Sequence, residues 1–158
     1  MPSSAQPDKA EVCVVPVNQD NWRAVTNLEV KTSQQSFVAA PSFYLALCCY
    51  GGTWQPLAFT LEDQVIGFGM WGFDPKDSSC WLGGILIDEK HQGKGYGTKA
   101  IKSTIEMLNR TLGHTAFALS YEPENLLAKR VYEAIGFVET GEFEDAEVVA
   151  RFTYERTK

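Results

Sequence analysis

The stretch His91-Gln-Gly-Lys-Gly-Tyr-Gly-Thr98 places three glycines at alternate positions around one lysine. It lies between residues 79–87, which predict a strand, and a helical pattern over residues 97–112. Glycine permits positive φ and lets a ligand approach the backbone without a Cβ in between. Because N–H groups at a helix N-terminus favour an anion, and Lys94 adds a cation, the loop predicts a phosphate-binding site.

Three phosphate-binding motifs can be compared with this loop. The P-loop motif needs Gly-Lys-Ser/Thr after a glycine and four spacer residues, a pattern that the loop lacks. The run Gly95-Tyr-Gly-Thr-Lys-Ala100 fits the alanine form of the dinucleotide fingerprint, but the roughly sixty residues that follow are too few for a full dinucleotide fold. The third motif, Gln-x-x-Gly-x-Gly, matches Gln92, Gly95 and Gly97.

The rest of the sequence predicts strands and helices on both sides of the loop. Residues rich in β-branched and aromatic side chains predict strands over 12–17, 57–61, 65–73, 79–87, 116–121, 137–141 and 148–154, the second and third forming a hairpin. Apolar spacing predicts a first helix carrying Trp22, Val25 and Leu28 and capped by Asn18 or Asp20, one or two short helices over 36–50 broken near Pro41, and helices over 97–112 and 125–135. The predicted helix over 97–112 carries four apolar residues on one face: Ile101, Ile105, Leu108 and Leu112. The order predicts a mixed α/β architecture in which helices cover a mostly antiparallel sheet.

Composition limits the class of protein. The chain has 158 residues, 44% of them apolar, with 20 acidic and 14 basic side chains and a formal net charge of −6. This charge does not favour nucleic acid or anionic lipid as a partner. No apolar run approaches the roughly 20 residues of a membrane helix, and the first residues do not resemble a signal peptide. We expect a disordered tail over residues 1–10 and one cytoplasmic domain over 11–158, with no membrane or nucleic-acid partner.

Cysteine and histidine positions give no metal pattern. No two cysteines form a CxxC pair, and both histidines lie far from the cysteines in sequence. The cysteines and histidines of the chain are Cys13, Cys48, Cys49, Cys80, His91 and His114. We expect no bound metal, and we expect the cysteines to be small buried apolar side chains.

Two stretches resemble the GNAT family of acetyl-CoA-dependent N-acetyltransferases. The first is the loop with Gln92, Gly95 and Gly97. The second, Asn125-Leu-Leu-Ala-Lys-Arg-Val-Tyr-Glu-Ala-Ile-Gly-Phe137, follows about thirty residues later and is similar to the family's signature of an Asn opening a helix and a Gly-Phe pair closing it. The predicted element order also matches over residues 12–154. The resemblance implies a GNAT fold with about seven strands, about four helices and a splayed parallel pair formed by the fourth and fifth strands.

The resemblance also implies roles for individual residues. The loop would wrap the pyrophosphate of coenzyme A, and the preceding strand would offer backbone groups to the pantetheine arm and polarise the acetyl carbonyl. The residues that would bind acetyl-CoA, the implied co-substrate, are Ile85, Leu86, Ile87, Gln92, Gly93, Lys94, Gly95, Tyr96, Gly97, Thr98, Asn125, Ala128 and Lys129. Tyr132 matches the family's usual general acid, which protonates the departing thiolate.

Acetyl transfer to an amine also requires removal of a proton. An alkylammonium has a pKa near 10.4, so forming the neutral amine at pH 7 costs about 4.6 kcal/mol. Some GNAT enzymes place a glutamate base on the fourth strand, but here Trp81 stands at that position. Glu29 and Glu122 are candidates to orient the amine or a proton-carrying water. The alternative interpretation is that both are solvated glutamates on the protein surface without a role in the reaction.

Four further segments of the sequence indicate the class of amine that accepts the acetyl group. Segments 28–30, 37–39, 120–125 and 136–141 resemble bacterial spermine/spermidine acetyltransferases. Carboxylates lining a groove, with an aromatic face from Trp54 or Tyr44, would suit a cationic polyamine. An aminoglycoside, an amino acid or a protein amine are alternative acceptors, and a non-catalytic acyl-CoA-binding module and a dinucleotide-binding protein are alternative functions. A homodimer is common in the family.

Overall fold

Seven strands in the part of the chain that the computed structural model describes, residues 11–155, form one sheet in the order β1-β2-β3-β4-β5-β7-β6. The strands are β1 (Val12–Pro16), β2 (Gln55–Leu61), β3 (Gln64–Asp74), β4 (Ser79–Ile87), β5 (Ala116–Tyr121), β6 (Val138–Glu144) and β7 (Glu147–Thr153). The helices are α1 (Trp22–Thr26), α2 (Pro41–Tyr50), α3 (Tyr96–Leu112) and α4 (Leu126–Ile135), with short 3-10 helices η1 (Thr32–Gln34) and η2 (Glu89–His91). The predicted mixed α/β architecture is confirmed, whereas the predicted tail over residues 1–10 lies outside the described residues.

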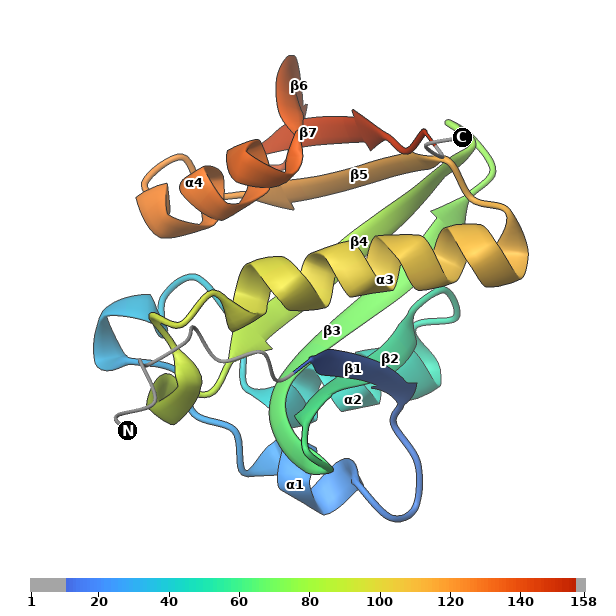
Figure 1. Cartoon of the computed structure of the whole chain (residues 1–158). Helices are drawn as coiled ribbons and strands as arrows, with labels where there is room; N and C mark the ends of the chain where they lie inside the picture. Colours follow the sequence, from blue (N-terminus) through green and yellow to red (C-terminus); the bar gives the residue numbers. More distant parts are fainter. Residues whose placement is uncertain (1–10, 156–158) are drawn as a thin grey trace, which may run out of the picture.

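The pairing of β4 with β5 is the one parallel contact among the described strands. It consists of two pairs, Cys80 with Phe117 and Trp81 with Ala118, after which the strands diverge toward their carboxyl ends (Figure 1). The predicted splayed parallel pair is therefore confirmed. Because its two strands separate, the sheet leaves backbone groups of both strands without a neighbouring strand at this point.

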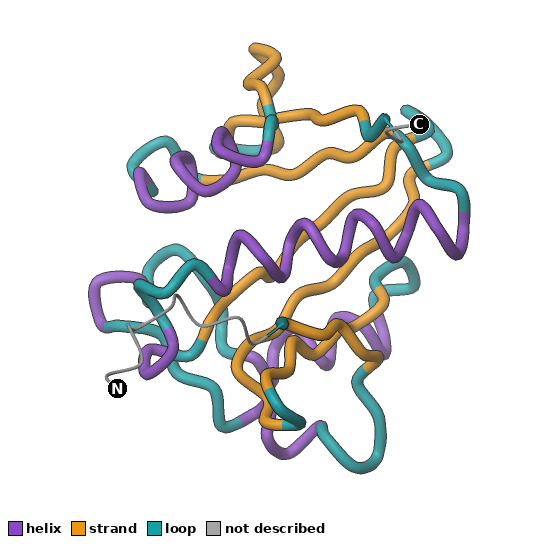
Figure 2. Tube along the Cα trace, viewed as in Figure 1, coloured by secondary structure: helices purple, strands orange, loops and turns teal. Residues whose placement is uncertain are grey.

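Successive side chains of β2 point alternately into two core layers, one on each face of the sheet. Leu57 and Phe59 pack with Tyr96 and Ala100 of α3, which lies across the strands (Figure 2). Ala58, between them, faces the opposite layer together with Val25, next to α1 and α2. This period of two is what a strand covered on both faces requires. The sheet is therefore a central layer with α3 on one side and α1 and α2 on the other.

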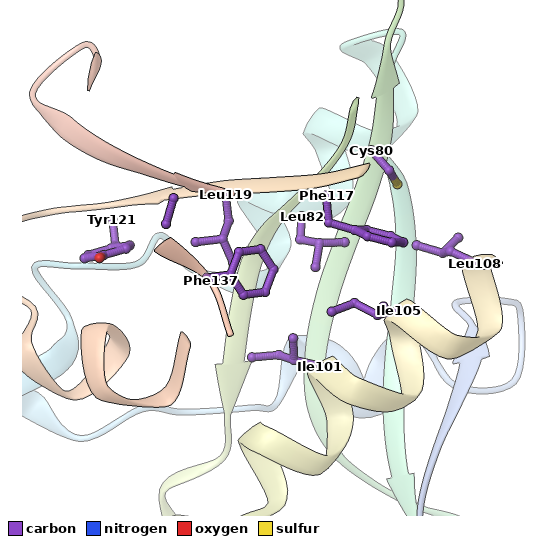
Figure 3. Close-up of a cluster of buried hydrophobic side chains, with 10 residues drawn as sticks. Cys80, Leu82, Ile101, Ile105, Leu108, Phe117, Leu119, Tyr121 and Phe137 are labelled. Atoms are coloured by element: carbon purple, nitrogen blue, oxygen red, sulfur yellow. The ribbon is translucent and has the colours of Figure 1, made fainter. Parts of the chain in front are cut away.

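A third core cluster joins the two halves of the sheet across the splayed strands. Ile101, Ile105 and Leu108 of α3 lie with Phe117 and Leu119 of β5, all of them at most 2% exposed (Figure 3). The cluster fixes where β5 and α4 stand relative to β4.

Three details of the sequence prediction are wrong. Leu112 is 54% exposed, because it lies one turn beyond the last core residue of α3, next to the helix-ending Gly113. Asn21, not Asn18 or Asp20, stands at the N-cap of α1, and the Asn18 side chain instead accepts hydrogen bonds from the backbone N–H groups of Asp20 and Asn21. Pro41 begins α2, since proline at the first helical position loses no helical hydrogen bond.

The cysteines differ from the expectation too. Cys80 is buried, but Cys13 and Cys49 are exposed and Cys48 is half-buried. Cysteine burial is set by where each strand or helix faces, which residue type alone does not decide. In residues 11–155 no helix is long and apolar enough to cross a membrane.

Candidate active site

A bulge in β4 stands where the two parallel strands have separated. Phe68 of β3 pairs with Leu86 and Met70 pairs with Gly83, so β4 holds one residue more than β3 in this interval. Gly84, inside the bulge, has a φ of +58°, a conformation that side-chain-bearing residues rarely adopt. The extra residue turns the backbone of β4 at its free edge. Backbone groups near Ile85 are thus placed to meet a ligand instead of another strand.

A cavity of about 360 Å³, here named the loop cavity, lies between this free edge, the glycine loop and α4. It gathers residues from both sequence stretches that suggested a cofactor. The predicted residues on its walls are Ile85, Leu86, Ile87, Gln92, Gly93, Gly95, Tyr96, Gly97, Thr98, Asn125, Ala128 and Tyr132. Segments some thirty residues apart in sequence therefore form one site.

The glycine loop has the conformation expected of an anion cradle. Gly93 and Gly95 have φ of +79° and +81°, and a Cβ at either would meet no atom within 4 Å. Gly95 is the N-cap of the 17-residue α3, so no side chain of its own covers the N–H groups of the first turn. Lys94, between Gly93 and Gly95, has no positive φ, and such a change of hand between neighbouring residues can turn successive backbone N–H groups toward a common point. The open space beside these glycines fits a group as large as a diphosphate.

Gln92 holds the loop in place. Its side-chain amide donates to the backbone carbonyl of Ile87 at 2.8 Å and exchanges two hydrogen bonds, 2.8 and 2.9 Å long, with the amide of Gln34. The loop is thereby tied both to the end of β4 and to η1. Gln34 lies in no motif, and its position 58 residues from Gln92 in sequence left no signal by which it could be predicted.

His91 lines the loop cavity, and one of its ring nitrogens is buried. Its Nδ1 is buried and has no hydrogen-bond partner in the described chain; the nearest carboxylate oxygen, of Asp88, is 3.9 Å away. A buried polar atom without a partner costs free energy unless a ligand or water satisfies it. The features of this site that fit a phosphate-bearing ligand are the open glycine loop and the start of α3.

A second cavity of about 600 Å³, here named the acidic cavity, opens between α2, the β3–β4 turn and the β6–β7 hairpin. Its aromatic walls include Tyr44, Trp54 and Trp81. Among the described residues that line it, the acidic side chains are Asp74, Glu122, Glu144 and Glu147, and the basic side chain is Lys76. With four carboxylates against one ammonium, this cavity favours a cationic ligand.

The two cavities meet along a shared wall. Phe37, Val38, Ile85, Asn125, Ala128 and Tyr132 line both. On α4, Asn125 caps the helix by accepting a 3.3 Å hydrogen bond from the N–H of Ala128, and the spacing to Tyr132 puts all three on one helical face. An anionic ligand in one cavity and a cationic ligand in the other would therefore come together at Tyr132.

The sequence matches the family described as "Acetyltransferase (GNAT) family" over residues 22–137. The chain belongs to the GNAT acetyltransferases. A curated relative, spermine/spermidine N(1)-acetyltransferase of Bacillus subtilis (strain 168), is 31% identical over 134 residues, which cover 81% of this chain and 88% of the relative. This GNAT chain is accordingly an N-acetyltransferase whose donor is acetyl-CoA.

Solved structures agree on the fold. Spermidine N-acetyltransferase from Vibrio cholerae, in complex with CoA and spermine, has a TM-score of 0.69 at 19% identity and covers 89% of this chain and 93% of its own. AAC(6')-Ib, in complex with ribostamycin and coenzyme A, has a TM-score of 0.76 at 18% identity, and the match covers 90% of this chain and 93% of AAC(6')-Ib. Both share the GNAT fold with this chain.

Tyr132 of this GNAT chain has surroundings that keep its phenol protonated. Its ring lies against those of Tyr121 and Phe137, with centroids 5.5 and 6.1 Å away. Burial, and after it the nearby charge of Glu147 and the proximity of Tyr44, raises the pKa of Tyr132 well above the usual value. No described residue hydrogen-bonds its hydroxyl, which leaves the proton available to a ligand at the meeting point of the cavities.

The structure does not bring every predicted residue to the cavities. Trp54 and Glu122 line the acidic cavity. Lys94 is exposed and lines neither cavity, and Lys129 lies 3.9 and 3.6 Å from carboxylates of α4 and β6, away from both. Glu29 is exposed outside both cavities and binds η2 through its backbone.

Proposed function

We propose that this GNAT enzyme acetylates a primary amine of a polyamine such as spermidine or spermine. Acetyl-CoA occupies the loop cavity and the polyamine occupies the acidic cavity. The observation that carries the proposal is the junction of the two cavities at Tyr132, with carboxylates concentrated on one side of it and a glycine loop on the other.

Backbone groups form the donor side of the site. The N–H groups of Gly93, Gly95 and the first turn of α3 hold the diphosphate, because the loop offers positive φ, open space and a helix N-terminus together. The pantetheine arm then follows the free edge of β4 toward Ile85. Bound acetyl-CoA supplies a thioester carbonyl, whose oxygen accepts a hydrogen bond from a backbone N–H of the β4 bulge.

The charge and size of the acidic cavity suit a polyamine as the acceptor. A cavity of about 600 Å³ with four carboxylates can hold an extended chain bearing several ammonium groups. Aromatic faces from Tyr44, Trp54 and Trp81 provide contacts for the methylene segments and for cation–π attraction. The similarity to the Bacillus subtilis spermine/spermidine acetyltransferase supports the same class of acceptor.

The chemistry takes place at the shared wall. The neutral amine attacks the thioester carbonyl, and the Tyr132 phenol donates its proton to the departing thiolate. A thiolate is stable enough in water to leave unaided, but the apolar surroundings of Phe37, Val38 and Ala128 would disfavour the free anion. Tyr132 avoids that penalty, because its proton goes to the thiolate while the surplus proton on the amine nitrogen restores the phenol.

An amine panel tests the proposal. Thiol release from acetyl-CoA is measured with spermine, spermidine, ribostamycin, lysine and a short peptide, and the product is identified by the mass of one added acetyl group. We expect kcat/KM for a polyamine to exceed that for every other amine by about tenfold or more, and to fall with rising salt. A higher kcat/KM for ribostamycin would indicate that the acceptor is an aminoglycoside and not a polyamine. Tight binding of coenzyme A without thiol release for any amine would indicate a non-catalytic binding module.

A further inference from the structure

Two glutamates of the β6–β7 hairpin, Glu144 and Glu147, have no cationic partner among the described residues, and of these two only Glu147 is half-buried. Glu142 pairs with Arg151 at 2.8 Å, and Glu139 lies 3.6 Å from Lys129. Glu147 is half-buried and forms no ion pair with any described residue. A carboxylate withdrawn from water and lacking a cation is a favourable site for an ammonium group.

The sheet brings Glu147 to the reacting end of the acidic cavity. β7 runs antiparallel to β5, with Val148 beside Tyr121, so β7 begins where β5 ends, on the side of α4 (Figure 1). There the Ser120 hydroxyl donates a 2.7 Å hydrogen bond to Oε1 of Glu147 and fixes the direction of the carboxylate. No described group donates to Oε2, which is left for a ligand.

Glu147 also lies close to the proposed acid. Burial is the main cause of the raised pKa of both Tyr132, on α4, and Tyr44, on α2, and the negative charge of Glu147 adds to it. The charges of Glu122 and Glu144, which line the same cavity, have no such effect on Tyr132. Three elements thus place Tyr44, Tyr132 and Glu147 around one space.

We propose that Glu147 receives the reacting ammonium of the acceptor and takes its proton, an inference that rests on the proposed function. One N–H proton passes to the carboxylate, and the freed lone pair forms the C–N bond at the thioester carbonyl carbon. The C–S bond breaks, the thiolate takes the Tyr132 proton, and the surplus proton on nitrogen returns to the Tyr132 oxygen. Glu147 then releases its proton to solvent. The products are one N-acetylamine, one free thiol and one proton, so atoms and charge balance.

The substitution Glu147→Gln tests this inference, since glutamine keeps the size and can still accept from Ser120. Steady-state kinetics are measured for the wild type, E147Q, E147D, E144Q and E106Q. Glu144 pairs with Glu147 across the hairpin and lines the same cavity, whereas Glu106 is exposed on α3. We expect kcat at pH 7 to fall about 100-fold in E147Q and to recover partly in E147D. In E144Q we expect only KM for the amine to rise, and E106Q should match the wild type.

The pH profile separates proton transfer from a structural role. The titratable side chains that line the acidic cavity together with Glu147 are Tyr44, Asp74, Lys76, Tyr121, Glu122, Tyr132 and Glu144. Without the carboxylate, the rate should rise about tenfold per pH unit toward the amine pKa near 10.4. A kcat for E147Q within about threefold of wild type, or an equal loss in E144Q, would overturn the inference. If the wild type acetylates no polyamine, the proposed function fails instead, and the same variants are compared on whichever amine the panel identifies.

Discussion

Replacing Tyr132 by phenylalanine removes one oxygen atom from the meeting point of the two cavities. The ring contacts with Tyr121 and Phe137 remain. No described residue hydrogen-bonds the hydroxyl, so none of the roughly 0.5–1.5 kcal/mol of a net hydrogen bond is lost on folding. The free energy of unfolding of Tyr132→Phe should therefore stay close to that of the wild type.

The effect on turnover should be large. A positioned general acid contributes about 10²- to 10⁴-fold to a rate, which corresponds to about 2.7–5.4 kcal/mol of activation free energy. The burial that raises the pKa of Tyr132 also keeps bulk water from taking over its role. We therefore expect kcat to fall about 1000-fold, or about 4 kcal/mol. The glycine loop and β4 are unchanged, so the Kd for acetyl-CoA should stay within about threefold.

The assay combines thiol release at saturating acetyl-CoA and spermidine, calorimetric titration with coenzyme A, and denaturant unfolding. Tyr121→Phe is the matched control, because Tyr121 neighbours Tyr132 and lines the acidic cavity but instead donates to Glu139 at 2.7 Å. It should lose some stability and keep kcat within about threefold. A kcat of Tyr132→Phe within about fivefold of wild type would refute the role of Tyr132 as the acid, and parallel losses of kcat and coenzyme A affinity would reassign it to binding.

Three further outcomes follow from the site. Gly95→Val should raise KM for acetyl-CoA about tenfold or more. Gly113→Val is the matched control, because Gly113 stands at the other end of α3 with a similar φ of +76° and equally open space. Both variants should lower the free energy of unfolding by a similar amount, but Gly113→Val should leave KM for acetyl-CoA unchanged. Lys76→Ala, which removes the basic side chain from the acidic cavity, should lower KM for spermine about twofold, an effect of about 0.5 kcal/mol that added salt would reduce. Because the pKa of Tyr132 is raised, its acid form persists with rising pH, so kcat should show no descending alkaline limb below about pH 10; a limb centred near pH 8 would contradict this assignment.

Local patterns were sufficient to predict the elements of the fold. The bounds of β4 and β5 coincide with the predicted strands over 79–87 and 116–121, because alternation and β-branching act over a few neighbouring residues. Failures gathered at element ends. Leu112 has the right helical spacing but lies beyond the region that the core covers, a boundary set by the packing of α3 and not by its own sequence.

The donor side of the site was predictable because it is contiguous in sequence, and on the acceptor side Tyr44, Trp54 and Glu122 were also predicted. The loop from Gln92 to Gly97 carries its chemistry in one short run, and α4 carries Asn125 and Tyr132 in another. Glu147 and Gln34 reach the cavities through strand pairing and a long-range hydrogen bond, which no local pattern encodes. Glu29, chosen for its place after the first helix, lies outside both cavities for the same reason.

The most direct test of the account is a crystal structure of the dead-end complex with coenzyme A and spermine. It measures the distance from the coenzyme A sulfur to the Tyr132 hydroxyl oxygen, with the diphosphate and the amine located in the same map. We expect the diphosphate on the loop at Gly93 and Gly95, the sulfur within about 3.5–4 Å of Tyr132, and a terminal amine of spermine in the acidic cavity beside it. A sulfur remote from Tyr132, or spermine bound outside the acidic cavity, would contradict the claim that the two cavities are the donor and acceptor sites of one reaction.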